Sequence, residues 1–263
     1  METVTYVLDE RAAIITIDRP RVRNAVDTVT ARKLAAAFER FVADDEADVA
    51  ILRGAGNTFC AGFDLHTVAE TGSGSIVPEG LAPMGPSRMV LPKPAIAAVE
   101  GYAVAGGLEL ALMCDLRVAA NDAVFGVFSR RFAVPLVDLG TIRLPRIVGH
   151  GRALDMILTG RPVGAREGVE MGLVNRLAEP GAALAVALEL ARTISGFPQA
   201  ALRNDRLSAI QQWDLTFAEA IRNEVRLGLA TFRSGETTHG AQRFADGAGR
   251  HGHGAIPGVE APK

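Results

Sequence analysis

Ala98-Val99-Glu100-Gly101-Tyr102-Ala103-Val104-Ala105-Gly106-Gly107-Leu108-Glu109-Leu110-Ala111-Leu112 is the stretch that decides the fold. Small apolar residues at 96–99 predict a buried strand, and the apolar run after the glycines predicts a helix. Gly106 and Gly107 have no Cβ, so a ligand can lie directly against their backbone. The unpaired N–H groups of the first helical turn carry partial positive charge and can hold an anionic oxygen.

Glu109 lies one turn inside this predicted helix. A carboxylate beside a site for an anionic oxygen suits proton transfer next to a carbonyl group. The alternative is that the glycines only permit close packing of strand and helix, and that Glu109 is a first-turn charge on the helix dipole. This stretch alone leaves both interpretations open.

A second glycine turn of the same form occurs at Phe59-Cys60-Ala61-Gly62-Phe63-Asp64-Leu65. Its glycine again permits close approach of the backbone, and Phe63 can present its N–H group there. Two such N–H groups that converge on one oxygen would form an oxyanion hole. Between the two turns, residues 71–86 are rich in Gly, Ser and Pro and predict either a mobile loop over the site or a plain surface connection.

Composition narrows the class of protein. The chain has 263 residues, of which 48% are hydrophobic and 22% charged, which is enough for one large core with an appendage. Its net charge of −2 does not indicate the excess of basic residues that is typical of nucleic-acid-binding proteins. Cys60 and Cys114 lack the spacing of a metal site and indicate a reduced, cytoplasmic protein. We expect no membrane span and no signal peptide, because neither pattern occurs.

The remaining pattern is mixed α/β. Two short β runs around a polar turn predict a hairpin at 4–8 and 12–17, and Asp27 predicts the start of a helix that buries Leu34, Phe38 and Phe41. Further strands are expected at 49–53 and 114–120. A helix-rich part begins near Thr141 and includes 182–194, 200–213, 217–232 and a helix with Leu154, Ile157 and Leu158 on one face. Residues 247–263 read as a loose tail.

Taken together, these motifs resemble the crotonase, or enoyl-CoA hydratase/isomerase, superfamily over nearly the whole chain. The resemblance rests on both glycine turns, on the pair Cys114-Asp115 and on four shorter matches: Asp18-Arg19-Pro20, Arg23-Asn24-Ala25, Gly160-Arg161-Pro162 and Gly172-Leu173-Val174-Asn175.

The resemblance implies a crotonase-type spiral of ββα turns at 1–195, followed by a helical oligomerisation region at 196–263. It implies homotrimers, often paired as hexamers, and acyl-CoA thioesters as substrates, with coenzyme A as part of the substrate and no separate cofactor. The N–H groups of Phe63 and Gly106 would hold the thioester oxygen. The residues expected on the coenzyme A side are Arg23, Asn24, Ala25, Ala61, Asp64, Leu65 and His66.

The chain departs from the family pattern at one position. Classical hydratases use two glutamates; Glu109 matches the first, but the second falls at Ser129, whose hydroxyl is far too weak an acid or base. Ser129 then either belongs to the catalytic set or only makes room for a different acyl group. Asp138 falls where some members carry a catalytic carboxylate, and its apolar neighbours would raise its pKa if it is buried. The alternative for Asp138 is an Asx-turn or a helix N-cap.

The leading hypothesis is an enoyl-CoA hydratase-like lyase of fatty-acid metabolism, with Glu109 as the main base and Asp138 as a second acid/base. The alternative is an isomerase, or a hydrolase or dehalogenase that uses Asp138. A third hypothesis, a coenzyme A-binding or RNA-binding protein with vestigial chemistry, is disfavoured by the near-neutral charge and the scarcity of lysine.

Overall fold

The computed structural model describes residues 2–71 and 76–248. The chain folds into two compact units, Met1–Ala191 and Arg192–Lys263. The division falls inside helix α7 (Ala183–Ser195), close to the predicted boundary at 195/196. The functions assigned to the two parts stay predictions.

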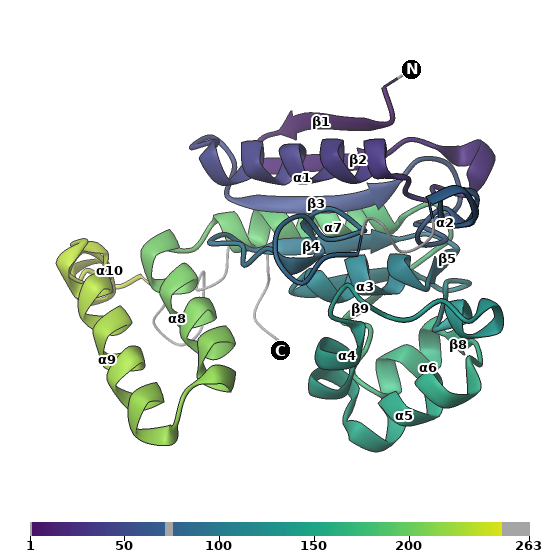
Figure 1. Ribbon diagram of the computed structural model, residues 1–263. Helices are drawn as coiled ribbons and strands as arrows, with labels where there is room; N and C mark the ends of the chain where they lie inside the picture. Colours follow the sequence, from purple (N-terminus) through teal and green to yellow (C-terminus); the bar gives the residue numbers. More distant parts are fainter. Residues whose placement is uncertain (1, 72–75, 249–263) are drawn as a thin grey trace. The chain divides into compact units, whose positions relative to one another are not determined.

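Within the described residues, unit 1 is built on a six-stranded sheet of order β1-β2-β3-β4-β6-β9 (Figure 1). The strands are β1 (Val4–Asp9), β2 (Ala12–Ile17), β3 (Val49–Gly54), β4 (Ala95–Val99), β6 (Leu116–Ala120) and β9 (Arg176–Ala178). The first two pair antiparallel, which confirms the predicted hairpin, and the others pair parallel. The near-continuous apolar sequence of β3 and β4 fits strands that are covered on both faces.

A smaller sheet carries the chain into the decisive helix. It joins β5 (Tyr102–Val104), β7 (Val124–Gly126) and β8 (Val163–Gly164). The predicted strand at 96–99 and the predicted helix after the glycines are observed as β4 and helix α3 (Gly106–Met113), but the sequence analysis did not predict the short strand β5 between them. Gly101, directly before β5, adopts a φ of +53°. All eight residues of α3 are buried.

Helix α1 (Thr28–Ala43) begins as predicted, because an Asp27 carboxylate oxygen accepts a 2.7 Å hydrogen bond from Thr30 N. It packs its buried face against β1 and β2. The other helices of this unit are α2 (Leu65–Thr71), α4 (Gly140–Val148), α5 (His150–Thr159) and α6 (Ala165–Glu170), with 3-10 turns η1 (Pro20–Val22), η2 (Pro86–Arg88) and η3 (Phe128–Phe132).

Helix α5 carries Leu154, Ile157 and Leu158 at the predicted helical spacing. Of these, Ile157 packs against the core, whereas Leu154 and Leu158 are exposed by 38% and 71%. The residues of α5 that are buried in the core are Ala153 and Met156.

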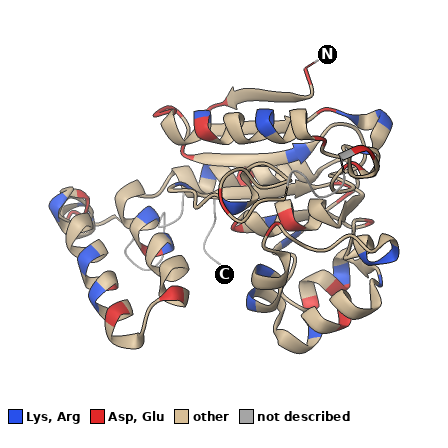
Figure 2. Ribbon diagram, in the orientation of Figure 1, with Lys and Arg blue, Asp and Glu red and all other residues tan. Residues whose placement is uncertain are grey.

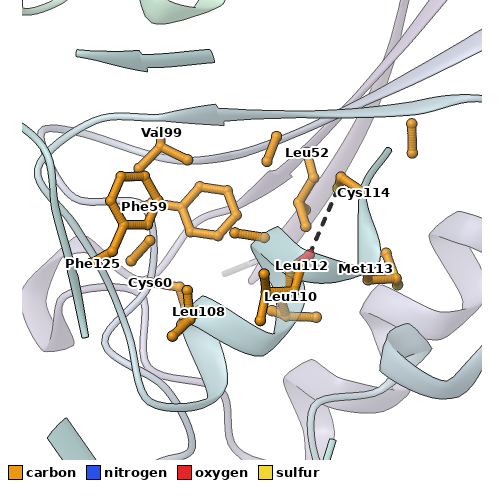
Figure 3. Close-up of a cluster of buried hydrophobic side chains, with 14 of the residues drawn as sticks. Leu52, Phe59, Cys60, Val99, Leu108, Leu110, Leu112, Met113, Cys114 and Phe125 are labelled. Carbon is orange, nitrogen blue, oxygen red and sulfur yellow. Dashed lines mark hydrogen bonds between the residues drawn. The ribbon is translucent and has the colours of Figure 1, made fainter. Parts of the chain in front are cut away.

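Helix α3 lies in the main core. Figure 3 shows Leu108 and Leu110 beside Cys60, Phe59 and Phe125, all of them fully or almost fully buried. Dense packing around a helix that carries a charged residue fixes where that residue can lie. Cys60 is a free, fully buried cysteine that belongs to this core.

Unit 2 is helical. It contains α8 (Gln199–Gln211), the short turn η4 (Gln212–Asp214), α9 (Phe217–Arg233) and α10 (Glu236–Ala245), the last of which the sequence analysis missed. A capping box of Thr216 and Glu219 starts α9. Acidic and basic residues both occur along α9 (Figure 2). The same helix carries a row of exposed apolar residues: Ile221, Val225, Leu229 and Phe232.

Two further predictions concern a membrane-spanning helix and the C-terminal tail. Within residues 2–71 and 76–248, no helix has the length and apolar character that crossing a bilayer requires. The predicted loose tail falls mostly at 249–263, outside the described residues.

Lys93, which lies far from α1 in the sequence, donates hydrogen bonds to carbonyl groups at the carboxyl end of α1. Its side chain is buried, with Lys93 5% exposed, and Nζ donates to the carbonyl oxygens of Phe41, Asp44 and Ala47 at 2.8, 2.7 and 3.0 Å. A cation at a helix carboxyl end satisfies carbonyl groups that the helix leaves without partners.

We expect Lys93→Met to lower the free energy of unfolding by about 2–4 kcal/mol, because buried carbonyl groups lose a charged donor. Urea unfolding followed by far-ultraviolet circular dichroism measures this. The matched control is Lys33→Met on the exposed face of α1, which should change stability by no more than about 0.5 kcal/mol. Equal effects of the two substitutions would contradict the role given to Lys93.

Candidate active site

The two glycine turns lie against each other. Cys60 pairs with Ala103 as an isolated parallel bridge, in which Cys60 N donates to Tyr102 O at 2.9 Å and Val104 N donates to Cys60 O at 3.1 Å. A Cβ added to Gly62 would lie 2.9 Å from Gly106 N, and one added to Gly107 would collide with Cys60 O. Glycine at these positions is therefore what permits the two backbones to approach.

Among residues 2–71 and 76–248, no hydrogen-bond acceptor is found for the N–H groups of Phe63 and Gly106. Phe63 pairs with Val26 through the groups of its neighbours, since Gly62 O accepts from Val26 N and Asp64 N donates to Val26 O. The Phe63 N–H group therefore points away from Val26. Gly106 is the first residue of α3, so its N–H group precedes the helical hydrogen bonds.

Ala105 stands at the entry to α3 with φ +53° and ψ −125°, a conformation that favours glycine. Its N–H group donates to Gly126 O at 2.9 Å. Strained backbone of this kind persists where the surrounding contacts determine it, and it is concentrated at functional sites.

Both turns border one cavity of about 410 Å³. Its lining includes Phe63 and Gly106 and is otherwise mostly apolar, with contributions from Ala61, Leu65, Val68, Ile76, Pro83, Ala105, Phe128, Phe132, Ala133, Val134, Pro135 and Val137. Among the described lining residues, those with polar side chains are Glu109, Ser129 and Asp138. A mostly apolar cavity with a few convergent polar groups is typical of a small-molecule site.

Glu109 is buried, with 2% of the residue exposed. Its Oε1 accepts hydrogen bonds from Asp138 N at 2.9 Å and Gly140 N at 2.8 Å, at the start of α4. Burial, and to a smaller extent the charge of Asp138, raise the pKa of Glu109 to about 8, although the two backbone donors oppose the rise. A Cβ on Gly140 would lie 2.8 Å from Oε1, so glycine leaves the space that the carboxylate fills.

Asp138 is also buried, with 2% of the residue exposed. Its Oδ1 accepts from Met84 N at 2.9 Å and from the Ser87 hydroxyl. Burial raises the pKa of Asp138, and the hydrogen bond from Ser87 is the largest effect that opposes the rise. The alternative role as a helix N-cap is not observed: Leu139 is the N-cap of α4, and the carboxylate that receives the first N–H groups there is that of Glu109.

Ser129 lies on the short turn η3 and is 7% exposed. Its Oγ is buried, and no hydrogen-bond partner for it is present in the described part of the chain. An unsatisfied buried hydroxyl costs about 1–3 kcal/mol. This cost indicates that the position serves something other than stability.

Two residues predicted on the coenzyme A side have side chains that the fold already uses. Asn24 is fully buried; Oδ1 accepts from Arg19 N, and Nδ2 donates to Ala55 O and Thr58 O at 2.9 and 2.6 Å. Asp64 pairs with Arg19 at 3.3 Å and accepts from His66 N at 3.1 Å, at the start of α2. These contacts show that both side chains help to shape this loop.

The other residues predicted on that side are divided between two places. Ala61 and Leu65 line the cavity, whereas His66 is exposed on α2. Arg23, together with Arg21 and Tyr102, lines a separate pocket. Ala25, which follows Asn24 in the sequence, is partly buried.

The sequence analysis missed Met84 and Ser87, which hold Asp138, because a lone methionine and a lone serine in a Pro-rich segment give no signal. The segment at 71–86 does border the cavity, through Ile76 and Pro83, while residues 72–75 lie outside the described part. Over the described ranges, no group of three or more His, Cys, Asp or Glu residues is placed to hold a metal ion.

Ser87→Ala should raise the pKa of Asp138 further, because a hydrogen bond to a charged acceptor is lost and this bond favours the ionised form. Carbon-13 NMR of aspartate-labelled protein measures the titration, with Asp138→Asn used to assign the signal. Ser234→Ala on unit 2 is the matched control and should leave the signal unchanged. An unshifted Asp138 titration in Ser87→Ala would contradict the contact.

Comparison with known proteins agrees with this geometry. Residues 9–249 match the family model for enoyl-CoA hydratase/isomerase. The chain is 35% identical over 240 residues to enoyl-CoA hydratase EchA19 of Mycobacterium tuberculosis, covering 89% of this chain and 90% of that protein. It is 33% identical over 222 residues to (E)-benzylidenesuccinyl-CoA hydratase of Thauera aromatica, covering 83% and 86%.

Among solved structures, enoyl-CoA hydratase EchA1 from Mycobacterium marinum aligns with a TM-score of 0.87 at 36% identity, covering 93% of this chain and 96% of that one. The match confirms the predicted crotonase-type fold with its C-terminal helices. The chain therefore belongs to the enoyl-CoA hydratase/isomerase family.

Proposed function

We propose that this chain is an enoyl-CoA hydratase-like lyase that stabilises a thioester enolate. The observation that carries the proposal is that the buried residues Glu109 and Asp138 line the same cavity as Phe63 and Gly106, whose N–H groups have no acceptor in the part of the chain that the structure describes. Donors held rigidly toward a developing oxyanion are worth more in a cavity of low polarity than in water.

The proposed reaction uses both carboxyl groups. The two N–H groups polarise the thioester carbonyl of a 2-enoyl-CoA. Water then adds its oxygen to C3, its proton passes to the ionised carboxylate, and the protonated carboxyl group gives its proton to C2. The pair ends with the same total charge, so the cycle needs no other proton source. Two buried carboxyl groups whose charges interact favour holding one proton between them at neutral pH.

Several further features belong to the same proposal. Coenzyme A enters as part of the substrate, with Arg23, Ala25 and His66 on its side of the site and no separate cofactor. The exposed apolar row of α9 supports a homotrimer or a hexamer, since contiguous apolar faces mark interfaces. We place the activity in fatty-acid metabolism in the cytoplasm.

Ser129 favours a second candidate. Because a hydroxyl stands where classical hydratases have a glutamate, one carboxyl group could instead move a proton between carbons in double-bond isomerisation. Asp138 could also attack the acyl group, as in hydrolysis or dehalogenation. Assays with 3-enoyl-CoA thioesters and with saturated thioesters distinguish these reactions from hydration.

Glu109→Gln and Asp138→Asn should each lower kcat for hydration of 2-enoyl-CoA by about 100- to 10,000-fold, because a positioned acid/base group is lost. Loss of 2-enoyl absorbance measures the rate. Glu39→Gln on the exposed face of α1 is the control and should keep full activity. Unchanged turnover in Glu109→Gln would remove this residue from the mechanism, whereas activity lost only in Asp138→Asn would favour the second candidate.

The pH dependence should follow Glu109, whose pKa is about 8. If the protonated form gives its proton to C2, kcat/KM for hydration stays level below pH 8 and falls about tenfold per unit above it. If the ionised form removes a proton, as in isomerisation, the rate instead rises toward pH 8. Initial rates from pH 6 to 9.5 separate the two signs, and a flat profile across pH 8 would contradict both.

A further inference from the structure

We propose that Arg88 is a positioning residue that holds the carboxyl group of Glu109 through a single peptide group. This peptide group joins Val137 to Asp138. On its carbonyl side, Arg88 Nη2 donates to Val137 O at 3.0 Å. On its N–H side, Asp138 N donates to Glu109 Oε1 at 2.9 Å. The inference rests on the proposed acyl-CoA function and adds a supporting residue to its acid/base pair.

The geometry of a peptide group makes these two hydrogen bonds one chain. The bond between Val137 and Asp138 is trans, so its C=O and N–H groups point in opposite directions. A cation that donates to the carbonyl oxygen polarises the peptide group and makes its N–H group a stronger donor. A stronger donor holds a carboxylate oxygen more firmly and favours the ionised form. Arg88 therefore acts on Glu109 through the backbone.

The turn η2, which carries Arg88, is anchored to the helices around it. It contacts α1 and α3, and a Cβ added to Gly85 would collide with Ala31 O of α1. From α4, Arg143 donates through Nη1 to Ser87 O. Because the backbone of the turn is held on these sides, the guanidinium of Arg88 extends from a fixed position.

The other terminal nitrogen of the guanidinium reaches a segment at the edge of the cavity. Arg88 Nη1 donates to Val77 O at 2.6 Å and to Pro78 O at 3.3 Å. The preceding residue, Ile76, lines the same cavity as Glu109. A planar guanidinium can join two segments in this way, whereas an ammonium group is a compact point charge. One side chain thus links the edge of the cavity to the peptide group that holds the carboxyl group.

The alternative is that Arg88 only stabilises the fold at 77–78. The hydrogen bonds to Val77 O and Pro78 O are exposed to solvent, where water can replace a lost donor. The hydrogen bond to Val137 O is partly buried, so its loss is harder to compensate. We therefore expect the main effect of removing Arg88 at the peptide group and at Glu109.

The acidity of Glu109 distinguishes the two roles by sign. Burial and, to a smaller extent, the charge of Asp138 raise its pKa to about 8, against the backbone donors at Gly140 and Asp138 and the charge of Arg143. Weakening the donor at Asp138 N should raise the pKa further. A general loosening of the fold would admit water and lower the pKa toward the ordinary range of glutamate.

The test is a titration of Glu109 by carbon-13 NMR of glutamate-labelled full-length protein, with Glu109→Gln used to assign the signal. In Arg88→Met the pKa of Glu109 should rise, and kcat for hydration of 2-enoyl-CoA should fall about 10- to 100-fold, because the carboxyl group is less well placed. Arg32→Met on the exposed face of α1 is the matched control and should change neither quantity.

Circular dichroism checks that each variant is folded. If Arg88→Met does not fold, the same comparison is made with Arg88→Lys, which keeps the charge but cannot donate to both segments at once, and the pKa of Glu109 should again rise. The proposal is overturned if this pKa is unchanged or falls in the folded variant. It is also overturned if the variant hydrates 2-enoyl-CoA with the kcat of the unaltered protein.

The titration does not depend on turnover, so it separates this inference from the proposed reaction. A rise in the pKa of Glu109 in Arg88→Met, in a protein that does not hydrate any 2-enoyl-CoA, would support the link through the peptide group and refute the reaction. Hydration by the unaltered protein, together with an unchanged titration in the variant, would support the reaction and refute the link.

Discussion

The contact between the two glycine turns is the constraint on which the site depends. The bridge between Cys60 and Ala103 places Gly62 beside Gly106, and a single added carbon at Gly62 or Gly107 would collide with the opposite turn. Main-chain hydrogen bonds and the absence of two Cβ atoms thus determine where two free N–H groups lie. The buried helix α3 then fixes Glu109 relative to them, because its whole length is packed in the core.

The carboxylate pair adds a second level of organisation. Glu109 is held by backbone donors at the start of α4, and Asp138 is held by Met84 and Ser87 from another part of the chain. Burial raises the pKa of both groups, and the charge of Asp138 makes Glu109 still harder to ionise. A cavity that is otherwise apolar gives these groups their altered acidity.

Much of this architecture could be predicted from the sequence. Local sequence patterns were enough for three features: the β1–β2 hairpin, helix α1 with its Asp27 cap, and the apolar helix α3. The periodicity of apolar residues and the residues that cap helices are properties of short segments of sequence. Phe63, Gly106, Glu109 and Asp138 were recognisable as candidates from two glycine motifs and one isolated carboxylate. The contacts made by Lys93, Met84 and Ser87 were not, because they join residues about 50 positions apart and have no local pattern. The short strand β5 was missed for a related reason, since three residues are too few to show a period.

The division of labour between main chain and side chains at this site bears on how its chemistry can change during evolution. The N–H groups of Phe63 and Gly106 and the two donors that hold Glu109 belong to the backbone, and most substitutions nearby leave them in place. The groups at Ser129 and Asp138 are side chains that a single codon change can replace. Under the proposed function, such a scaffold would keep its backbone contacts to a carbonyl oxygen while a change of side chain alters which bond is made or broken. Diversification of the reaction then requires no new fold.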